Sequence, residues 1–216
     1  MTGQNDKPDA LLLMGRHCPY CPTVLKALES LQQDGTIGAL ETAFIEDHPG
    51  MAEEFGVRSV PWLRLGPYEL SGLRSAEELR EWAGKAGSLT GMSTYLAELI
   101  ASGSIDKCLE LIRADSDNLK ALLQLFTRQD TELNIRIGIS AIMESLQGHP
   151  VLGTITDDLH KLLSHDEPAV RGDACYYLAL SGHHDAVEWI RQLLNDSDRN
   201  VREIAHDSLE VLTGAD

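Results

Sequence analysis

The chain has few basic residues for its length. Its 216 residues include 18 Lys and Arg against 34 Asp and Glu, which gives a formal net charge of −16. Nonspecific nucleic-acid binding needs clustered Lys and Arg to displace counterions from phosphates, so we expect no nucleic-acid partner. An anionic membrane surface is disfavoured for the same reason. The acidic surface either keeps the protein soluble or steers it toward a basic partner.

Long apolar runs are also missing. No stretch approaches the ~20 apolar residues of a membrane helix, so we expect no membrane partner. The run Ala10–Met14 is too short for a signal-peptide core, and the preceding segment Met1–Asp9 is polar. We therefore expect a cytoplasmic protein. In that compartment a Cys-x-x-Cys pair is more often catalytic or metal-binding than structural.

The first half of the chain alternates strand and helix signals. Ser75, with Glu78 three residues later, is typical of a capping box that starts a helix. The pattern predicts strands at 10–14, 42–45, 62–65 and 69–71, and helices following the cysteines to about 33, at 51–55 and at 75–82. The order β-α-β-α-β-β-α implies an α/β domain, a small sheet with helices on both faces.

The segment 84–91 is rich in helix breakers, and strand signals vanish after it. We place one domain at 1–87 and a second, all-α domain at 92–216. Short polar connections suggest antiparallel neighbours. Helical patterns occur at 93–101, 105–113, 117–127, 132–146, 151–163, 168–181, 184–195 and 199–213.

The helical half contains a repeat. Leu162–Ala174 aligns with Leu193–Ala205 at an offset of 31 residues, and Asp130–Arg136 looks like a degenerate third copy. The segments resemble the HEAT family in its short bacterial form, an Asp-rich turn leading into Val-Arg-x-x-Ala. The resemblance implies a curved solenoid that binds protein partners.

Four residues of these repeats have structural interpretations. We expect Asp166 and Asp198 to cap helices. We expect Arg171 and Arg202 to pair with carboxylates on neighbouring repeats.

The segment His17–Cys21, with the sequence His-Cys-Pro-Tyr-Cys, carries the chemistry. Cys18 lies at a strand-to-helix junction, where unpaired N–H groups and the helix dipole favour a thiolate. That thiolate can attack a disulfide, and Cys21, one turn later, can resolve the mixed disulfide. We expect Pro19 at the first helical position, where its missing N–H costs nothing.

Pro61 opens a predicted strand, ~40 residues after the cysteines. A proline there has a plain structural interpretation, because its missing N–H is harmless at a strand start. Alternatively, a cis Val60–Pro61 bond would place Pro61 against the cysteines and leave the Val60 backbone free to pair with an extended substrate.

The first 85 or so residues resemble the thioredoxin-like proteins, and the Cys-Pro-Tyr-Cys motif resembles that of glutaredoxins. The resemblance implies that Cys18 is the nucleophile, Cys21 the resolving thiol and Pro61 a cis-proline. The candidate substrate-binding residues are Pro19, Tyr20, Val60 and Trp62.

Three positions depart from these families. Gly15 stands where many glutaredoxins carry a Lys that holds glutathione, and Ser71–Arg74 only partly matches their Gly-Gly-x-Asp segment. Leu12 replaces the buried acid of thioredoxins, so proton transfer from Cys21 lacks that helper. We therefore expect no cofactor. Glutathione is the one cofactor whose binding the resemblance leaves open.

Three further interpretations concern His17, a possible metal site and the two remaining cysteines. His17 either stabilises the Cys18 thiolate as an imidazolium or is an exposed side chain of no consequence. Metal binding through His17, Cys18 and Cys21 lacks a fourth ligand, so we expect no metal site. Cys108 and Cys175 lie among apolar residues and behave as small core side chains.

Three functions remain open. The first is a thiol–disulfide oxidoreductase whose helical half recruits a protein client. The second is an interaction adaptor that keeps the domain as a scaffold. The third is a redox sensor in which oxidation of Cys18 and Cys21 alters what the repeats bind.

Overall fold

The computed structural model describes residues 7–214, and the chain divides into two compact units, 1–92 and 93–216. The first unit is built on a four-stranded sheet with helices, and the second is helical, as the sequence predicts. Residues 1–6, part of the polar segment read above as lacking a targeting signal, lie outside the described residues. None of the described helices is long and apolar enough to cross a membrane.

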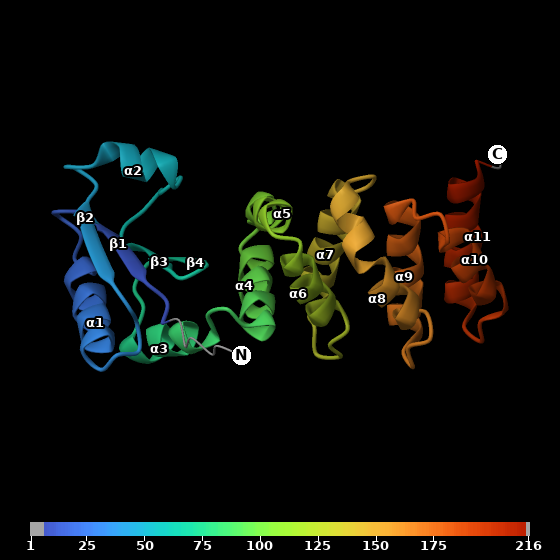
Figure 1. Ribbon diagram of the computed structural model, residues 1–216, viewed down its shortest axis with the longest axis horizontal. Helices are drawn as coiled ribbons and strands as arrows, with labels where there is room; N and C mark the ends of the chain where they lie inside the picture. The colour runs from blue at the N-terminus through green and yellow to red at the C-terminus, as the bar shows by residue number, and fades with distance from the viewer. Residues whose placement is uncertain (1–6, 215–216) are drawn as a thin grey trace, which may run out of the picture. The chain divides into compact units, whose positions relative to one another are not determined.

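The elements of the N-terminal unit follow the predicted order (Figure 1). A two-residue turn joins the last two strands, and Gly66 has a φ of +55° there, which a residue without a Cβ adopts freely. The elements are β1 (Ala10–Met14), α1 (Cys21–Gln33), β2 (Leu40–Phe44), α2 (Pro49–Glu54), β3 (Trp62–Leu65), β4 (Tyr68–Ser71) and α3 (Ala76–Lys85).

The sheet has the strand order β2-β1-β3-β4. β1 pairs in parallel with β2 and antiparallel with β3, and β3 pairs antiparallel with β4. All five residues of β1 are buried, which explains why this strand is a continuous apolar run in the sequence. The first cysteine follows the carboxyl end of this central strand.

Helices cover both faces of the sheet, as expected. Leu11, Leu13 and Trp62 form one buried cluster, against which Met51 of α2 and Phe55 pack. Successive strand residues point to opposite faces, so Leu12 faces the other layer, where α1 and α3 pack together. The predicted capping box at the start of α3 is present.

The C-terminal unit stacks its helices in pairs, with α9 packed against both α8 and α11 (Figure 1). The segment 84–91 is more helical than predicted, because α3 runs to Lys85 and the next helix starts at Leu89. The helices are α4 (Leu89–Ala101), α5 (Ile105–Ala114), α6 (Asp117–Phe126), α7 (Leu133–Ser145), α8 (Thr156–Leu162), α9 (Pro168–Ser181), α10 (Ala186–Arg191) and α11 (Arg199–Thr213). Two predicted helices are α-helical over only part of their length, because the 3₁₀ helix Pro150–Ile155 precedes α8 and the 3₁₀ helix Gln192–Asn195 follows α10.

The repeats are joined by a nearly buried ion pair. The Arg171 guanidinium donates two hydrogen bonds to the Asp196 carboxylate, at 2.7 and 2.8 Å, across the two copies of the repeat. The two side chains are 11% and 8% exposed. The hydrogen bond from Arg171 lowers the pKa of Asp196. The predicted pairing of Arg171 with a neighbouring carboxylate is therefore confirmed.

Two other predictions for the repeats are wrong. Arg202 donates to the backbone carbonyls of Asp196 and Ser197 instead of to a carboxylate. Asp166 does not cap α9, whose N-cap is Glu167, while Asp198 caps α11 as expected. Glu167 occupies the place that corresponds to Asp198, but its longer side chain accepts no capping hydrogen bond from the helix.

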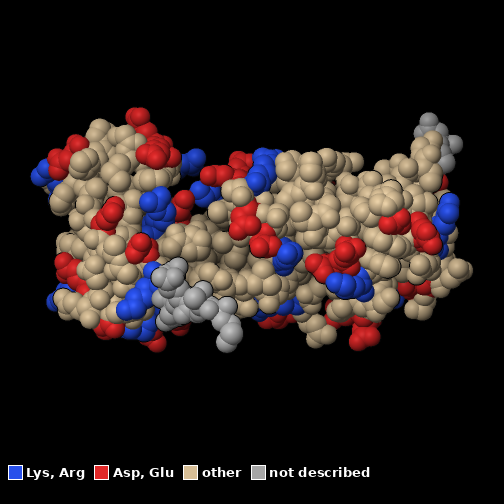
Figure 2. Space-filling view, in the orientation of Figure 1, with Lys and Arg blue, Asp and Glu red and all other residues tan. Residues whose placement is uncertain are grey.

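On the face shown in Figure 2, carboxylate side chains are mixed with Lys and Arg over both units.

Candidate dithiol site

The two cysteines lie on the loop between β1 and α1 and at the start of α1. Cys18 and Cys21 form a disulfide, with their Cα atoms 5.5 Å apart. Cys18 is half-buried, whereas Cys21 is only 2% exposed. Cys18 is thus the member of the pair that a macromolecular disulfide can reach.

The N-terminus of α1 is directed at the Cys18 sulfur. The Cys21 N–H donates to Cys18 Sγ at 3.1 Å, and the Cys18 N–H donates to the Gly15 carbonyl at 3.1 Å. Cys21 is the first residue of α1, so its N–H is the first donor of the helix. Pro22, the next residue, has no N–H. A donor and the positive end of the helix dipole both favour a sulfur anion at this place.

Pro19 is not the first helical residue, contrary to our expectation. α1 begins at Cys21 with Tyr20 as its N-cap, and Pro22 occupies the first turn instead. The prediction assumed that the helix starts directly after Cys18. The proline tolerated at a helix start is therefore the one that follows the motif.

Val60 and Pro61 directly precede β3, and Val60 lies close to the cysteine loop. Their peptide bond is cis, and Pro61 is buried. A Cβ added to Gly15 would lie 3.0 Å from Val60 Cγ2 and 3.7 Å from Cys18 Cβ. Gly15 therefore leaves the space that lets Val60 lie beside Cys18.

Arg16 holds the cysteine loop to the segment after β2. Its backbone N–H donates to Glu46 Oε1 at 2.9 Å, and its guanidinium donates to both oxygens of Asp47 at 2.7 Å. These bonds lower the pKa of Glu46 and raise that of Arg16. The sequence does not predict these bonds, because about 30 residues separate the partners and no local pattern indicates the pairing.

The remaining candidates differ in their surroundings. His17, Pro19 and Tyr20 are exposed around Cys18, and Tyr20 is 53% exposed. Trp62 is 4% exposed, and its ring stacks on Phe55 with centroids 5.3 Å apart. The Trp62 side chain is thus part of the core, and its backbone is paired in the sheet with Leu13 and Ser71, so Trp62 is not placed to contact a substrate.

The other two cysteines are shielded. Cys108 and Cys175 are free thiols with no exposed surface. Burial raises the pKa of Cys108 to about 12 and that of Cys175 to about 11. Neither thiol is suited to disulfide exchange at neutral pH.

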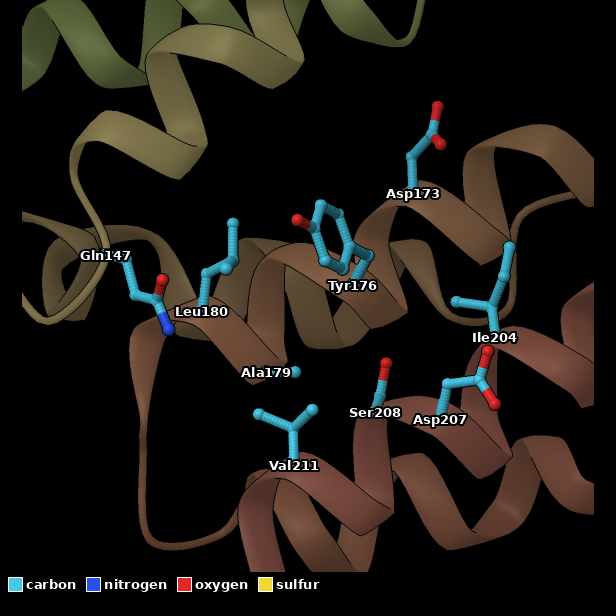
Figure 3. A pocket seen from close by; sticks show the side chains of 9 residues that line it. All are labelled: Gln147, Asp173, Tyr176, Ala179, Leu180, Ile204, Asp207, Ser208 and Val211. Atoms are coloured by element: carbon cyan, nitrogen blue, oxygen red, sulfur yellow. The ribbon is translucent and has the colours of Figure 1, made fainter.

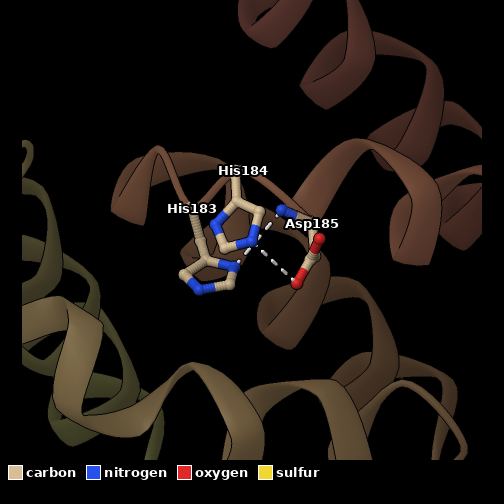
Figure 4. Close-up of side chains that lie close together, drawn as sticks. All are labelled: His183, His184 and Asp185. Carbon is tan, nitrogen blue, oxygen red and sulfur yellow. Dashed lines mark hydrogen bonds and ion pairs between the residues drawn. The ribbon is translucent and has the colours of Figure 1, made fainter.

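A cluster of possible metal ligands lies in the turn after α9 (Figure 4). The candidate ligand atoms of His183, His184 and Asp185 lie within 4.8 Å of one another. These atoms already have partners within the turn: His183 Nδ1 accepts from the Asp185 backbone N–H, and His184 Nε2 lies 3.2 Å from Asp185 Oδ2. We assign no metal to this cluster, which is on the helical unit and apart from the dithiol chemistry.

The fold and the cysteine pair define a thioredoxin-like domain followed by stacked helical pairs. Comparison with protein families supports both parts: residues 10–84 match a thioredoxin domain, and residues 156–214 match HEAT repeats. The chain thus combines a thioredoxin-like domain with HEAT-like repeats. Comparison with curated proteins gave no match.

Proposed function

We propose that the protein is a thiol–disulfide oxidoreductase that acts on protein disulfides in the cytoplasm, with repeats that recruit its protein partner. The observation that carries this proposal is the hydrogen bond from the Cys21 N–H to the Cys18 sulfur. A donor in that position stabilises the thiolate, both as the attacking group and as the leaving group of the reverse step.

The reaction has two exchange steps in the reducing direction. The Cys18 thiolate attacks one sulfur of the client disulfide, and the client's other sulfur leaves as a thiolate that takes a proton from solvent. The Cys21 thiol then loses its proton and attacks Cys18 Sγ, which releases the second client sulfur. The client gains two electrons, and Cys18 and Cys21 are left as a disulfide.

Two features support a protein disulfide, rather than glutathione, as the substrate. The guanidinium of Arg16, two residues before Cys18 in the sequence, is bound to Asp47, so a glutathione carboxylate would have to compete with Asp47 for it. Pro19 and Tyr20 present an exposed surface next to Cys18 that suits a larger partner. HEAT repeats generally mediate protein interactions, so the second unit is the part that we assign to recruitment.

A redox-sensing adaptor with little turnover is the second candidate. Leu12 favours it, because this fully buried apolar side chain stands where a thioredoxin carries a proton-accepting acid. Slow deprotonation of Cys21 would then make the mixed disulfide long-lived.

Reduction of insulin by dithiothreitol tests the proposal. We expect the wild type to accelerate insulin precipitation and Cys18→Ser to return it to the uncatalysed rate. The matched control is Cys175→Ser, which removes a shielded thiol and leaves the rate unchanged. If the wild type is no faster than Cys18→Ser, the enzymatic proposal is wrong and the adaptor remains.

A further inference from the structure

Most of the large exposed apolar side chains described in the C-terminal unit lie on α7, α9 and α11. Leu133 and Ile137 of α7 are 73% and 62% exposed, Tyr176 of α9 is 37% exposed, and Val211 of α11 is 70% exposed. These helices are neighbours in the stack, since α7 packs on α9 and α9 on α11. The Tyr176 hydroxyl donates to Glu144 of α7 at 3.2 Å, which ties the surfaces of two of these helices together.

A pocket lies between α9 and α11 on this surface (Figure 3). Its volume is about 330 Å³, and Tyr176, Leu180, Ile204 and Val211 supply most of its apolar lining. The volume falls at the lower end of the range for ligand pockets, ~300–1,000 Å³. It is enough for one bulky side chain of a partner but small for a whole helix.

The charged residues that line the pocket are both acidic, Asp173 and Asp207. Within residues 7–214, the structure gives neither carboxylate a hydrogen-bond donor or a cation within 4 Å. Burial raises the pKa of Asp173, and Arg136 opposes the rise only by longer-range attraction. A Lys or Arg from a partner would therefore pair with the partly buried Asp173, and the exposed Asp207 adds a second negative charge at the same pocket.

We propose that this pocket is a docking site for a basic segment of a partner protein, which inserts one bulky apolar side chain between α9 and α11. Lys or Arg residues next to that anchor pair with Asp173 and Asp207. Aromatic and large aliphatic anchors of this kind carry most of the energy of many interfaces. The docking site is argued from the pocket and its lining alone. Only the further step, that the bound partner is a client for Cys18, rests on the proposed function.

Peptide binding to the full chain tests the docking site. The probe is a fluorescein-labelled peptide, Gly-Ser-Lys-Leu-Phe-Lys-Arg-Gly, titrated by fluorescence anisotropy. We expect saturable binding that is lost when Leu and Phe are replaced by Ser, or when the three basic residues are replaced by Glu. Binding also weakens as salt is raised, since charge pairs contribute to it.

Four variants assign the binding to the pocket. Val211→Asp and Asp207→Lys change exposed side chains, so the fold tolerates them, and each should weaken binding by about tenfold or more. The matched controls are Leu194→Asp and Glu110→Lys, which change exposed residues that do not line the pocket. The controls should bind within about twofold of the wild type, on a scale where tenfold is 1.4 kcal/mol.

The outcomes separate this proposal from the proposed function. The titration is repeated on Cys18→Ser, where binding should persist because docking needs no thiol. Insulin activity without peptide binding overturns the docking site alone, and binding without insulin activity overturns the enzyme alone. Equal binding by the acidic peptide, or a wild-type dimer that Val211→Asp dissociates in light scattering, also overturns the docking site.

Discussion

Cys18 of the N-terminal unit and the two cysteines of the C-terminal unit differ in exposure and in surroundings. The thioredoxin-like unit leaves Cys18 half-exposed at the end of a helix, with an N–H donor on its sulfur. The HEAT-like unit encloses Cys108 and Cys175 completely, and burial raises the pKa of both thiols. Because all the cysteines have the same side chain, we expect any difference in their reactivity to come from their positions in the fold.

Thiol alkylation gives the largest expected difference between the units. After reduction of the disulfide at neutral pH, iodoacetamide should label Cys18 at least ~10³ times faster than Cys175, whose pKa of about 11 leaves about 10⁻⁴ of it ionised. Peptide mass spectrometry measures both rates in one sample. Cys108 is the internal control and should be slower still. Comparable labelling of Cys175 in the folded protein would remove the contrast.

The ion pair between repeats should make the largest single contribution to stability among the polar contacts considered. Arg171→Ala should destabilise the C-terminal unit by about 3 kcal/mol, because it leaves the nearly buried Asp196 carboxylate unpaired. Arg202→Ala is the matched control and loses only bonds to carbonyls, at a cost of about 1 kcal/mol. Hydrogen exchange in α9 and α11 locates the effect. Equal losses in the two variants would show that the ion pair is not special.

Acid should weaken that same contact. The pKa of Asp196 is lowered in the folded state, so its contribution is present above the unfolded pKa of about 3.9 and is lost as pH falls through the folded pKa. The stability difference between the wild type and Asp196→Asn should therefore shrink from pH 5 to pH 2. Urea denaturation at several pH values measures it. A difference that does not change with pH would contradict the assigned charge.

The capping box gives the smallest expected effect and tests the thioredoxin-like unit. The Ser75 hydroxyl accepts from the Glu78 N–H, and the Glu78 carboxylate accepts from the Ser75 N–H. Ser75→Ala should destabilise this unit by about 1 kcal/mol. Ser30→Ala, on the exposed face of α1, should instead be neutral or slightly stabilising, because Ala is the better helix former. Thermal denaturation followed by circular dichroism compares the two.

Local signals account for what could be predicted from the sequence. β1 is found at the predicted residues because an unbroken apolar run suits a strand buried on both faces. The capping box is read from four neighbouring residues, so its prediction needs no tertiary information. The sequence places Cys18 correctly near the N-terminus of α1, because the pattern predicts both the strand before it and the helix after it.

The misses arise where the chain makes contacts across distance or chooses between similar local options. The tether from Arg16 to Glu46 and Asp47 joins separate loops, and no periodicity reports such a pair. Pro19 and Pro22 both fit a helix start, and only the structure shows that α1 begins after the first of them. The pocket between α9 and α11 depends on which side chains the stacking leaves uncovered.

The most direct test of the central claim is to trap the exchange intermediate. Cys21→Ser should accumulate a mixed disulfide between Cys18 and a client disulfide such as that of insulin, because no second thiol is in place to release it. Intact-mass spectrometry should show the protein plus one insulin molecule, whose chains stay joined by their remaining disulfide, with Cys18 as the modified residue and no adduct on Cys18→Ser. An adduct that forms through Cys21 on Cys18→Ser, or none on Cys21→Ser while the wild type turns over, would contradict the account.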